Sequence, residues 1–376
     1  MFLIREVRSG DLEQLLGLGC ALDSVNLPTD ARTMARVIER SQRSFRGSIR
    51  DRARAVYLFC AQEAGSAMLA GASMIIAKHG TPQSPHYYME IGTEERYSHT
   101  LRKMFRHTFL RLRYSMDGPT EFGGLIVAPT YRAHPQRVGK QLSWMRFLYI
   151  GKHPERFQPE IIAEIMPPKT DAGSHLLWDH YGRRVTGLSF KEADRLSARD
   201  KEFIRALFPE APLYTFLLPE DVRASIGAVS KQSRPAVALL ERAGLRFLGQ
   251  IDPFDGGPYY GAATSELVGL KSLCSRRIES GNVVLEGALR YMVAREDREH
   301  GFRAVAVGAE LDSRRVVARP EALEMLNVGV GEPVDVLVLP DTSATASPAH
   351  GAESLTEAKP PQKRPAPRTG APMNRR

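Results

Sequence analysis

Several features that define other protein classes are scarce in this chain of 376 residues. It has only three cysteines, Cys20, Cys60 and Cys274, and they lie far apart without CxxC spacing. We therefore expect neither a disulfide framework nor a cysteine-based zinc site. The histidines show no HExxH or paired spacing, so the sequence predicts no metal site at all.

Long apolar runs are also missing. No stretch of about 18 apolar residues occurs, and the opening MFLIREVRSGDLEQ contains charged side chains from its fifth residue onward. A membrane span needs such a stretch, and a secretory signal needs an uninterrupted apolar segment. We expect no membrane association, and a cytoplasmic protein.

Positive charge is in excess, with a net charge of +9. From Thr342 onward six basic residues face two acidic ones, so this segment carries +4 and the rest of the chain only +5. The segment 342–376 is rich in Pro, Ala, Ser and Thr and has few large apolar residues, a composition that predicts disorder. The charge of the remainder suits a small anionic cofactor, and we expect no nucleic-acid partner.

The order of elements predicts an α/β (α+β) protein with a mixed, mostly antiparallel sheet flanked by helices. A strand and a helix open the chain, a second helix covers about 30–45, and two apolar runs read AVYLFCAQ and AMLAGASMIIA. The turn-like EAGS between these runs predicts an antiparallel pair. Next come a strand at EFGGLIVAP, an amphipathic helix over 134–153, and a buried strand, EIIAEIMPP, that carries Glu164.

We expect three parts along the chain. Residues 1–275 form the main region, which could consist of two similar halves. Residues 276–341 form a small β-rich unit, because NVVLEGALRYMVA, FRAVAVGAEL and PVDVLVLP are strand-like and EALEMLNVG is helical. Residues 342–376 form the basic tail.

The segment LIVAPTYRAHPQRVGKQLSWMRF is the most informative one, because a strand runs into a basic loop and then into a helix. Backbone amides at a helix N-terminus can bind a pyrophosphate, and Arg132, Arg137 and Lys140 add positive charge. Gly139 lets the backbone approach closely. A P-loop is excluded, because the required upstream glycine is missing and Gln141 stands where Ser or Thr is needed. The alternative is an ordinary basic loop that caps an amphipathic helix.

This arrangement resembles the coenzyme A site of the GNAT acyltransferases, whose loop pattern is loosely [QR]-x-x-G-x-[GA]. Gln136 and Gly139 fit this pattern, and Gln141 departs from it. Further segments resemble the arginine N-succinyltransferase family: IREV with SGDLEQL, NLPTD, IIAEIM, SHLLWDHYGRR, FPEAPLYTFLLPEDVRASIG and ERAGLRFLGQIDPFDGGP. The resemblance extends from about residue 2 to 340, including ALEMLNVGVGEPVDVLVL.

The resemblance implies direct transfer of a succinyl group from succinyl-CoA to the α-amine of L-arginine, the first step of arginine catabolism. Succinyl-CoA would be a co-substrate, with no permanently bound cofactor, in a homo- or hetero-oligomer. A backbone N–H at Leu125 or a neighbour would stabilise the negative charge that develops on the thioester carbonyl. The residues expected to bind the acyl-CoA are Leu125, Val127, Arg132, Gln136, Arg137, Gly139 and Lys140.

One expected catalytic group is absent. The family has a histidine as proton donor in a segment resembling IGQVHPQ, and here IGAVSKQ places Ser230 at that position. A serine hydroxyl does not titrate near pH 7, whereas the incoming amine has a reference pKa of about 8 and must lose a proton. We name Tyr214 first and Glu164 next as substitutes, with His175 and Lys231 as weaker candidates.

Recognition of arginine needs a carboxylate opposite the guanidinium, because a carboxylate accepts its forked donors in pairs. Asp255 is the best candidate, and His175 lies in another family-like segment. Gly256 and Gly257 allow a tight turn whose amides could contact a carboxylate of the substrate or of the succinyl group. The alternative is a simple hairpin turn that starts at Asp255.

Three other functions stay open. The chain could be an acyl-CoA-dependent N-acyltransferase with a different donor or acceptor, which the change at Ser230 would accompany. It could be a catalytically silent subunit that binds acyl-CoA or an amino acid. A nucleic-acid-binding protein would instead use the basic tail and the small β-rich unit, and its salt-sensitive affinity would be lost on removal of the residues after Asp341.

Overall fold

The computed structural model describes residues 1–21, 27–170, 173–283 and 290–340. The helices within these ranges are α1 Leu12–Ala21, α2 Ala31–Phe45, α3 Val138–Lys152, α4 Arg183–Thr186, α5 Phe190–Ser197, α6 Glu202–Leu207, α7 Glu220–Ser225, α8 Arg234–Ala243 and α9 Pro320–Leu326. None of these described helices is both long enough and apolar enough to cross a membrane.

The described strands join in one sheet, in the order β14-β15-β11-β16-β12-β13-β1-β2-β3-β6-β7-β10-β9-β4-β5-β8. Their bounds are β1 Phe2–Glu6, β2 Val56–Glu63, β3 Leu69–Ile76, β4 His86–Ser98, β5 Lys103–Ser115, β6 Thr120–Val127, β7 Glu160–Glu164, β8 Leu213–Tyr214, β9 Arg246–Ile251, β10 Pro258–Ala263, β11 Cys274–Ser280, β12 Tyr291–Asp297, β13 Gly301–Val307, β14 Glu310–Leu311, β15 Arg315–Ala318 and β16 Pro333–Val338.

Most neighbouring strands are antiparallel, and the parallel pairs are β6 with β7 and β11 with β15. The predicted mixed, mostly antiparallel sheet flanked by helices is confirmed. The antiparallel pair β2 and β3, the strands β6 and β7 and the helices α2 and α3 also lie where the sequence predicts them.

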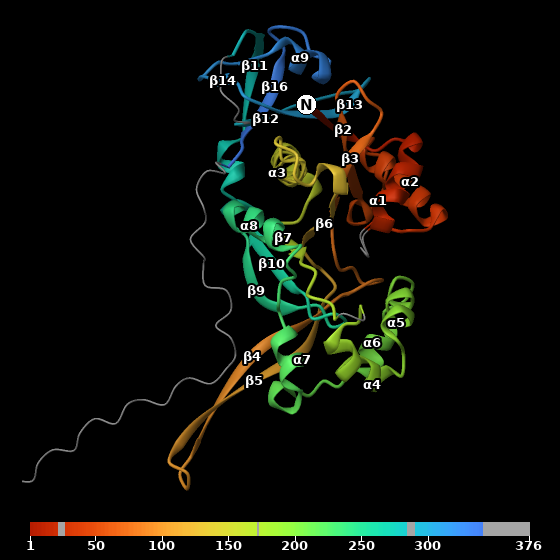
Figure 1. Ribbon diagram of the computed structural model, residues 1–376, viewed down its shortest axis with the longest axis vertical. Coiled ribbons are helices and arrows are strands. Elements are labelled where there is room, and N and C mark those ends of the chain that lie inside the picture. The colour runs from red at the N-terminus through yellow and green to blue at the C-terminus, as the bar shows by residue number, and fades with distance from the viewer. Residues whose placement is uncertain (22–26, 171–172, 284–289, 341–376) are drawn as a thin grey trace, which may run out of the picture. The chain divides into compact units, whose positions relative to one another are not determined.

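Helices cover both faces of the central strands (Figure 1). On one face α1 and α2 pack on residues such as Leu58, Met74 and Ile126. On the other face α3 packs on Phe59 and Phe122. The sheet is therefore a layer between two hydrophobic cores, which explains why β2 and β3 read as nearly continuous apolar runs.

Helix α3 is more deeply buried than an amphipathic helix, because every residue from Gln141 to Ile150 is buried. The sheet covers one side of it, and C-terminal elements cover the other, where the Trp144 Nε1–H donates to the Val338 carbonyl at 3.0 Å. Arg146 is enclosed in this layer, with its guanidinium 4.4 Å from the centre of the Phe122 ring. Burial lowers the pKa of Arg146 to about 9.

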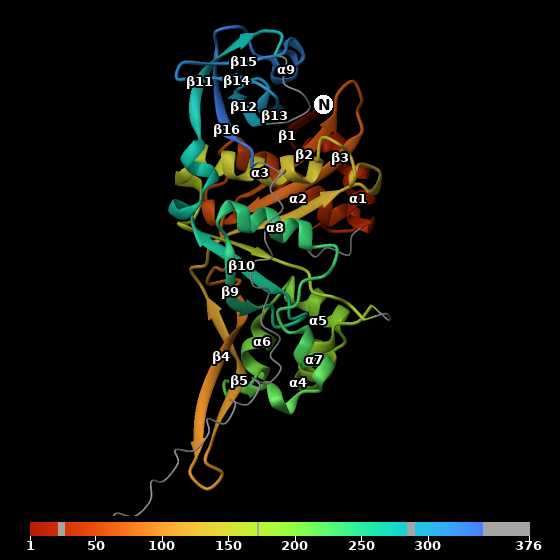
Figure 2. The ribbon, with the colours of Figure 1, turned by 60° about the vertical axis from the view of Figure 1, so that its left-hand side comes forward.

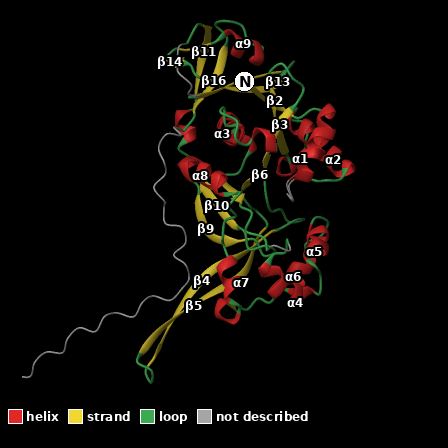
Figure 3. Cartoon of the chain, in the orientation of Figure 1, coloured by secondary structure: helices red, strands yellow, loops and turns green. Residues whose placement is uncertain are grey.

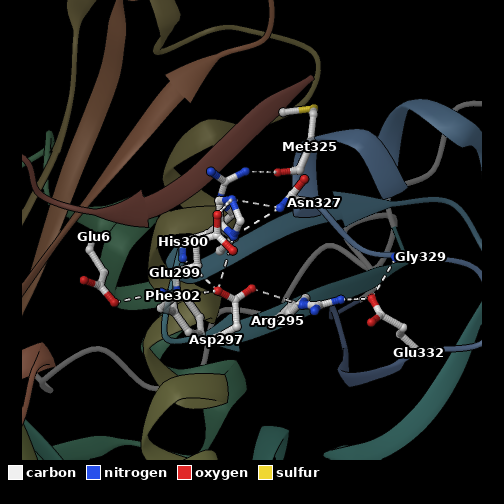
Figure 4. Close-up of polar contacts among 11 residues, drawn as sticks. Glu6, Arg295, Asp297, Glu299, His300, Phe302, Met325, Asn327, Gly329 and Glu332 are labelled. Carbon is white, nitrogen blue, oxygen red and sulfur yellow. Dashed lines mark hydrogen bonds and ion pairs between the residues drawn. The ribbon is translucent and has the colours of Figure 1, made fainter.

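The C-terminal strands continue the main sheet, because β13 pairs with β1. At this junction the Glu6 carboxylate accepts a hydrogen bond from the Phe302 amide, and nearby Arg295 pairs with Asp297 and Glu332 (Figure 4). Residues Met1–Thr345 form one compact unit, and the expected boundary at 275–276 falls inside β11. The tail predicted over 342–376 lies outside the described residues.

Two features stand out near the other end of the sheet. Strands β4 and β5 pair residue for residue, from His86 with Ser115 to Ser98 with Lys103, as one long hairpin (Figure 2). The short helices α4 to α7 gather beside its base around a core that contains Leu177 and Trp178 (Figure 3).

Candidate active site

The parallel strands β6 and β7 separate near the centre of the sheet. Among the described residues they pair only at Thr120 with Ile161 and at Glu121 with Ile162. Beyond these pairs the remaining part of β6 follows β3 alone. Backbone groups on the β7 side of β6 are therefore left without a sheet partner.

A bulge in β6 changes which side chains face each layer. The register with β3 shifts between Ala72 and Met74, and Gly124 has φ +55°, a left-handed conformation that suits glycine. Phe122 and Ile126 consequently face opposite cores although they lie four residues apart. Leu125 and Val127 pack against the α3 side.

The backbone direction after the bulge favours the expected contact with an acyl group. The Ala128 N–H donates to the carbonyl of Ala70 on β3 at 2.9 Å. Because successive amides of an extended chain point to opposite sides, the Val127 N–H faces the side from which β7 has separated.

The basic loop leads from β6 into α3. Arg137 adopts φ +50° immediately before the helix, and both Arg137 and Arg132 are exposed. Lys140 is half-buried, and its Nζ donates to the Pro340 carbonyl at 2.7 Å, whereas the Nε of exposed Arg132 donates to the Val127 carbonyl at 3.3 Å. Gln141, which departs from the acyltransferase pattern, is buried, and its side chain donates to the Gln136 carbonyl at 2.7 Å. Gln141 thus fixes the loop through a side-chain contact.

A cluster of carboxylates lies at the end of β7. Glu164 ends this strand, Asp252 follows β9, and Asp255 lies in the loop before β10; one oxygen of each lies within 4.8 Å of the others. All three are partly accessible to solvent. The surrounding protein nevertheless desolvates them, and this burial, together with repulsion from Asp252, raises the pKa values of Glu164 and Asp255 well above the ordinary range. Burial also raises the pKa of Asp252.

The chain holds this carboxylate cluster in place through its own amides. Asp252 accepts hydrogen bonds from the amides of Phe254 at 2.7 Å and Asp255 at 3.0 Å. Asp255 in turn accepts from the Gly257 amide at 2.7 Å. A side chain at Gly257 would lie 2.5 Å from the Ile165 carbonyl oxygen, so this turn needs glycine there to lie against β7. The hydrogen bonds from these backbone amides oppose the rise in pKa that burial causes, and they orient the carboxylates.

Further titratable groups surround the carboxylate cluster. Tyr259 lies opposite Glu164 in the β7–β10 register, and its hydroxyl donates to Asp252 Oδ2 at 3.4 Å. Glu121 is buried on β6 and pairs with His79. Lys201 is attracted to Asp252, Glu121 and Glu164, and burial lowers its pKa. The region therefore contains more carboxylates than cations, which favours a positively charged ligand.

Ser230 lies next to this region. Its amide donates to the carbonyl of Met166, two residues beyond Glu164, at 3.2 Å. In the same loop the Gly227 amide donates to the Gly256 carbonyl at 3.0 Å. The Ser230 hydroxyl donates to Ser233 Oγ at 2.8 Å, at the beginning of α8. The structure thus brings the segments of Glu164, Asp255–Gly257 and Ser230 together.

The structure does not bring Tyr214 to this place. Tyr214 lies on β8, and β10, β9, β4 and β5 separate this strand from β7 in the sheet. Its hydroxyl donates to Glu94 Oε2 at 2.6 Å, and this bond raises the pKa of Tyr214. Tyr214 is therefore poorly placed to donate a proton at the end of β7.

His175 lies in the layer of short helices. It is buried, and its ring stacks on Phe190 with 4.2 Å between ring centres. Nearby Leu177 approaches Gly256, so this layer forms one boundary of the glycine turn. These contacts are those of a packed aromatic side chain.

Asp252, Glu121, Lys201 and Tyr259 were missed from the sequence. For Asp252 a signal existed, since IDPFDGGP has a second aspartate three residues before Asp255, a spacing typical of a side chain that caps its own turn. Glu121 and Lys201 join the site only through tertiary packing, and no local pattern marks them.

Comparison with known proteins gives a consistent result. The family profile described as "Arginine N-succinyltransferase beta subunit" matches residues 2–268. A protein named arginine N-succinyltransferase from Yersinia pseudotuberculosis serotype O:3 (strain YPIII) is 32% identical over 349 residues, covering 90% of this chain and 98% of the relative. The protein of the same name from Citrobacter koseri is 28% identical and covers 92% of this chain and 100% of that relative.

A solved structure matches as well. The arginine/ornithine succinyltransferase subunit AI from Pseudomonas aeruginosa superposes with a TM-score of 0.78 at 25% identity, over 91% of this chain and 99% of that chain. The sheet and its helical layers are thus shared over nearly the full length of both proteins.

Proposed function

Because the chain belongs to the arginine N-succinyltransferase family, we propose that it transfers a succinyl group from succinyl-CoA to the α-amine of L-arginine. The observation that carries this proposal is the cluster formed by Glu164, Asp252 and Asp255, three desolvated but accessible carboxylates at the end of β7. Such a cluster is costly without a cation, and arginine brings both a guanidinium and an α-ammonium group.

The guanidinium is the natural partner of Asp255 and Asp252. A carboxylate accepts the forked donors of a guanidinium in pairs, and desolvation strengthens such a bond. The amides of Phe254, Asp255 and Gly257 fix one oxygen of each aspartate, and the Tyr259 hydroxyl donates to Oδ2 of Asp252, so both carboxylates are oriented before the ligand binds.

Glu164 is the group best suited to take the proton from the α-amine. Its raised pKa lies closer to that of the amine than an ordinary carboxylate's does, which favours proton transfer near neutral pH. In the reaction the nitrogen attacks the thioester carbonyl, the C–S bond breaks, and the proton lost by the amine becomes available for the departing thiolate. Glu164 would then replace the family histidine, whose position Ser230 occupies.

The separation of β6 from β7 suits the acyl-CoA. The Val127 N–H, or that of Leu125 two residues earlier, would donate to the thioester oxygen as negative charge develops on it. Arg132, Arg137 and the first amides of α3 would bind the pyrophosphate. Lys140, which is tied to Pro340, would contribute through its charge.

A specific observation favours a second function, that of a silent acyl-CoA-binding subunit. Ser230 stands where the family has its proton donor, and its hydroxyl is engaged by Ser233. Such a subunit would bind succinyl-CoA and release no thiol.

The test is a thiol-release assay with the purified chain, succinyl-CoA or acetyl-CoA, and a panel of amines including arginine and ornithine, alongside Ser230→His. We expect arginine-dependent release by the natural sequence, with succinyl-CoA preferred. Binding of succinyl-CoA without turnover, restored by Ser230→His, would instead establish the silent subunit. If neither binding nor turnover occurs, the proposed transferase is refuted.

A further inference from the structure

The hairpin formed by β4 and β5 extends beyond the rest of the sheet. β9 pairs with β4 only at Met89 and Glu90, and β8 pairs with β5 only at Phe109 and Leu110. Among the described residues, 91–98 and 103–108 therefore have no strand partner outside the hairpin. We call residues 91–109, which include the turn at the tip, the arm (Figures 1 and 2).

An isolated two-stranded ribbon is at best marginally stable in water, and its free edges invite pairing with another chain. At its base the arm is well fixed, since Phe109 lies over Gly92 so closely that a side chain at Gly92 would meet the ring at 2.3 Å. Toward the tip it exposes Tyr97, Leu101 and Met104, each at least 50% accessible. Such apolar exposure on an unsupported ribbon indicates an interface.

A second exposed surface lies beside the base of the arm, on residues 200–221, which include α6 and α7. Thr215 Oγ1 donates to the Thr108 carbonyl at 3.1 Å, and the Phe216 ring lies 5.0 Å from that of His107. Leu207, Phe216 and Leu217 are each at least 49% accessible on it. We call residues 200–221 the α6–α7 surface.

The charges of these two surfaces are complementary. The arm has four basic residues against two acidic ones, a net +2, and the α6–α7 surface has five acidic residues against two basic ones, a net −3. Of the two basic residues, Lys201 is turned inward toward the carboxylate cluster. The exposed face of residues 200–221 is therefore strongly acidic.

We propose that two copies of this chain associate about a two-fold axis, with the arm of each lying on the α6–α7 surface of the other. In a two-fold interface each contact occurs twice. One arm and one complementary surface on each chain are therefore sufficient to form both contacts of a dimer. From base to tip the arm spans about 25–30 Å at roughly 3.3 Å per residue. Two arms lying antiparallel therefore bring each tip near the base of the other, where the α6–α7 surface begins.

The proposal is tested by mass measurement in solution, by light scattering coupled to size exclusion, with the full chain at about 10–50 μM. The natural sequence should elute with a mass of at least twice the 41.8 kDa of the monomer. A triple variant Tyr97→Ser, Leu101→Ser, Met104→Ser should shift it to the monomer. The matched control Val330→Ser removes an apolar side chain that is 67% exposed in the turn between α9 and β16 and should leave the mass unchanged.

A charge exchange separates this interface from any other. The double variant Lys103→Glu with Arg106→Glu reverses the net charge of the arm. The double variant Glu210→Lys with Glu220→Lys reverses the net charge of the α6–α7 surface. Each variant alone should be monomeric, because like charges then face each other in both contacts. Mixing the two variants should restore association, because both contacts in the mixed pair are again complementary.

A monomeric natural sequence would overturn the proposal and leave the arm to a different protein. So would association that survives both single reversals. Thermal unfolding of every variant should remain a single cooperative transition, lowered at most by the stabilisation that association contributes, and this shows that loss of association is not loss of folding.

Discussion

The basic loop before α3 and the carboxylate cluster at the end of β7 follow adjacent parallel strands, yet they hold their charges differently. Arg132 and Arg137 are exposed, and water solvates them at little cost. Glu164 and Asp255 are desolvated beside each other, so their ionised forms are costly. Under the proposed function the exposed charges would attract the anionic acyl-CoA, whereas the desolvated charges would select one cation.

The largest effect is expected when a carboxylate of the cluster is neutralised. Glu164→Gln should lower kcat by about 10²–10⁴-fold, because the proton acceptor is lost. Asp255→Asn should mainly weaken arginine binding and raise the KM for arginine by about 100-fold, because a charge-assisted pair of hydrogen bonds is lost. Steady-state thiol release with arginine varied separates the two effects.

The control for both substitutions is Glu299→Gln, which removes a carboxylate whose side chain is 84% exposed and should leave both constants unchanged. If Glu164→Gln retains full kcat, Glu164 is not the base. The proton transfer must then be assigned to another group.

The same carboxylates should reduce the stability of the ligand-free protein. The pKa of Glu164 is raised on folding from its ordinary value near 4.5, so between the two values the folded chain binds more protons than the unfolded chain. The free energy of unfolding therefore falls as pH rises through this window. Asp252→Asn or Glu164→Gln should raise it at pH 7 by roughly 1–3 kcal/mol.

Denaturant unfolding at pH 5 and pH 7 without substrates measures this effect. The gain from Glu164→Gln should be smaller at pH 5, where Glu164 in the natural sequence is more often protonated. A variant less stable than the natural sequence at pH 7 would show that the repulsion is already compensated in the ligand-free protein.

The smallest effect is expected at the basic loop. Arg132→Ala and Arg137→Ala should each raise the KM for succinyl-CoA by about 3- to 10-fold, with kcat and the KM for arginine unchanged, because an exposed cation interacts weakly through water. This increase in KM should diminish above roughly 0.5 M salt, because salt then screens the attraction between the arginines and the acyl-CoA. A loss of kcat would instead place these residues next to the reacting atoms.

The local sequence pattern was sufficient to predict much of the fold and part of the candidate site. Alternating or continuous apolar runs located β2, β3, β6 and β7, because burial of one or both faces of a strand leaves a pattern in the sequence. The β4–β5 hairpin left no such pattern, since the arm exposes both of its faces and mixes apolar with charged side chains on each. Helix α3 was predicted as amphipathic, and its burial on all sides depends on strands nearly 200 residues later, as the bond from Trp144 to Val338 shows.

Local sequence was enough to identify the family, the strand–loop–helix segment around Gly139 and the candidates Glu164 and Asp255. Each of these depends on residues close together in the chain, where backbone geometry and spacing restrict the outcome. Tertiary packing brings Asp252, Glu121 and Lys201 to these two carboxylates and holds Tyr214 away from them. Electrostatic interaction depends on distance through space and on desolvation, and neither is encoded in local spacing.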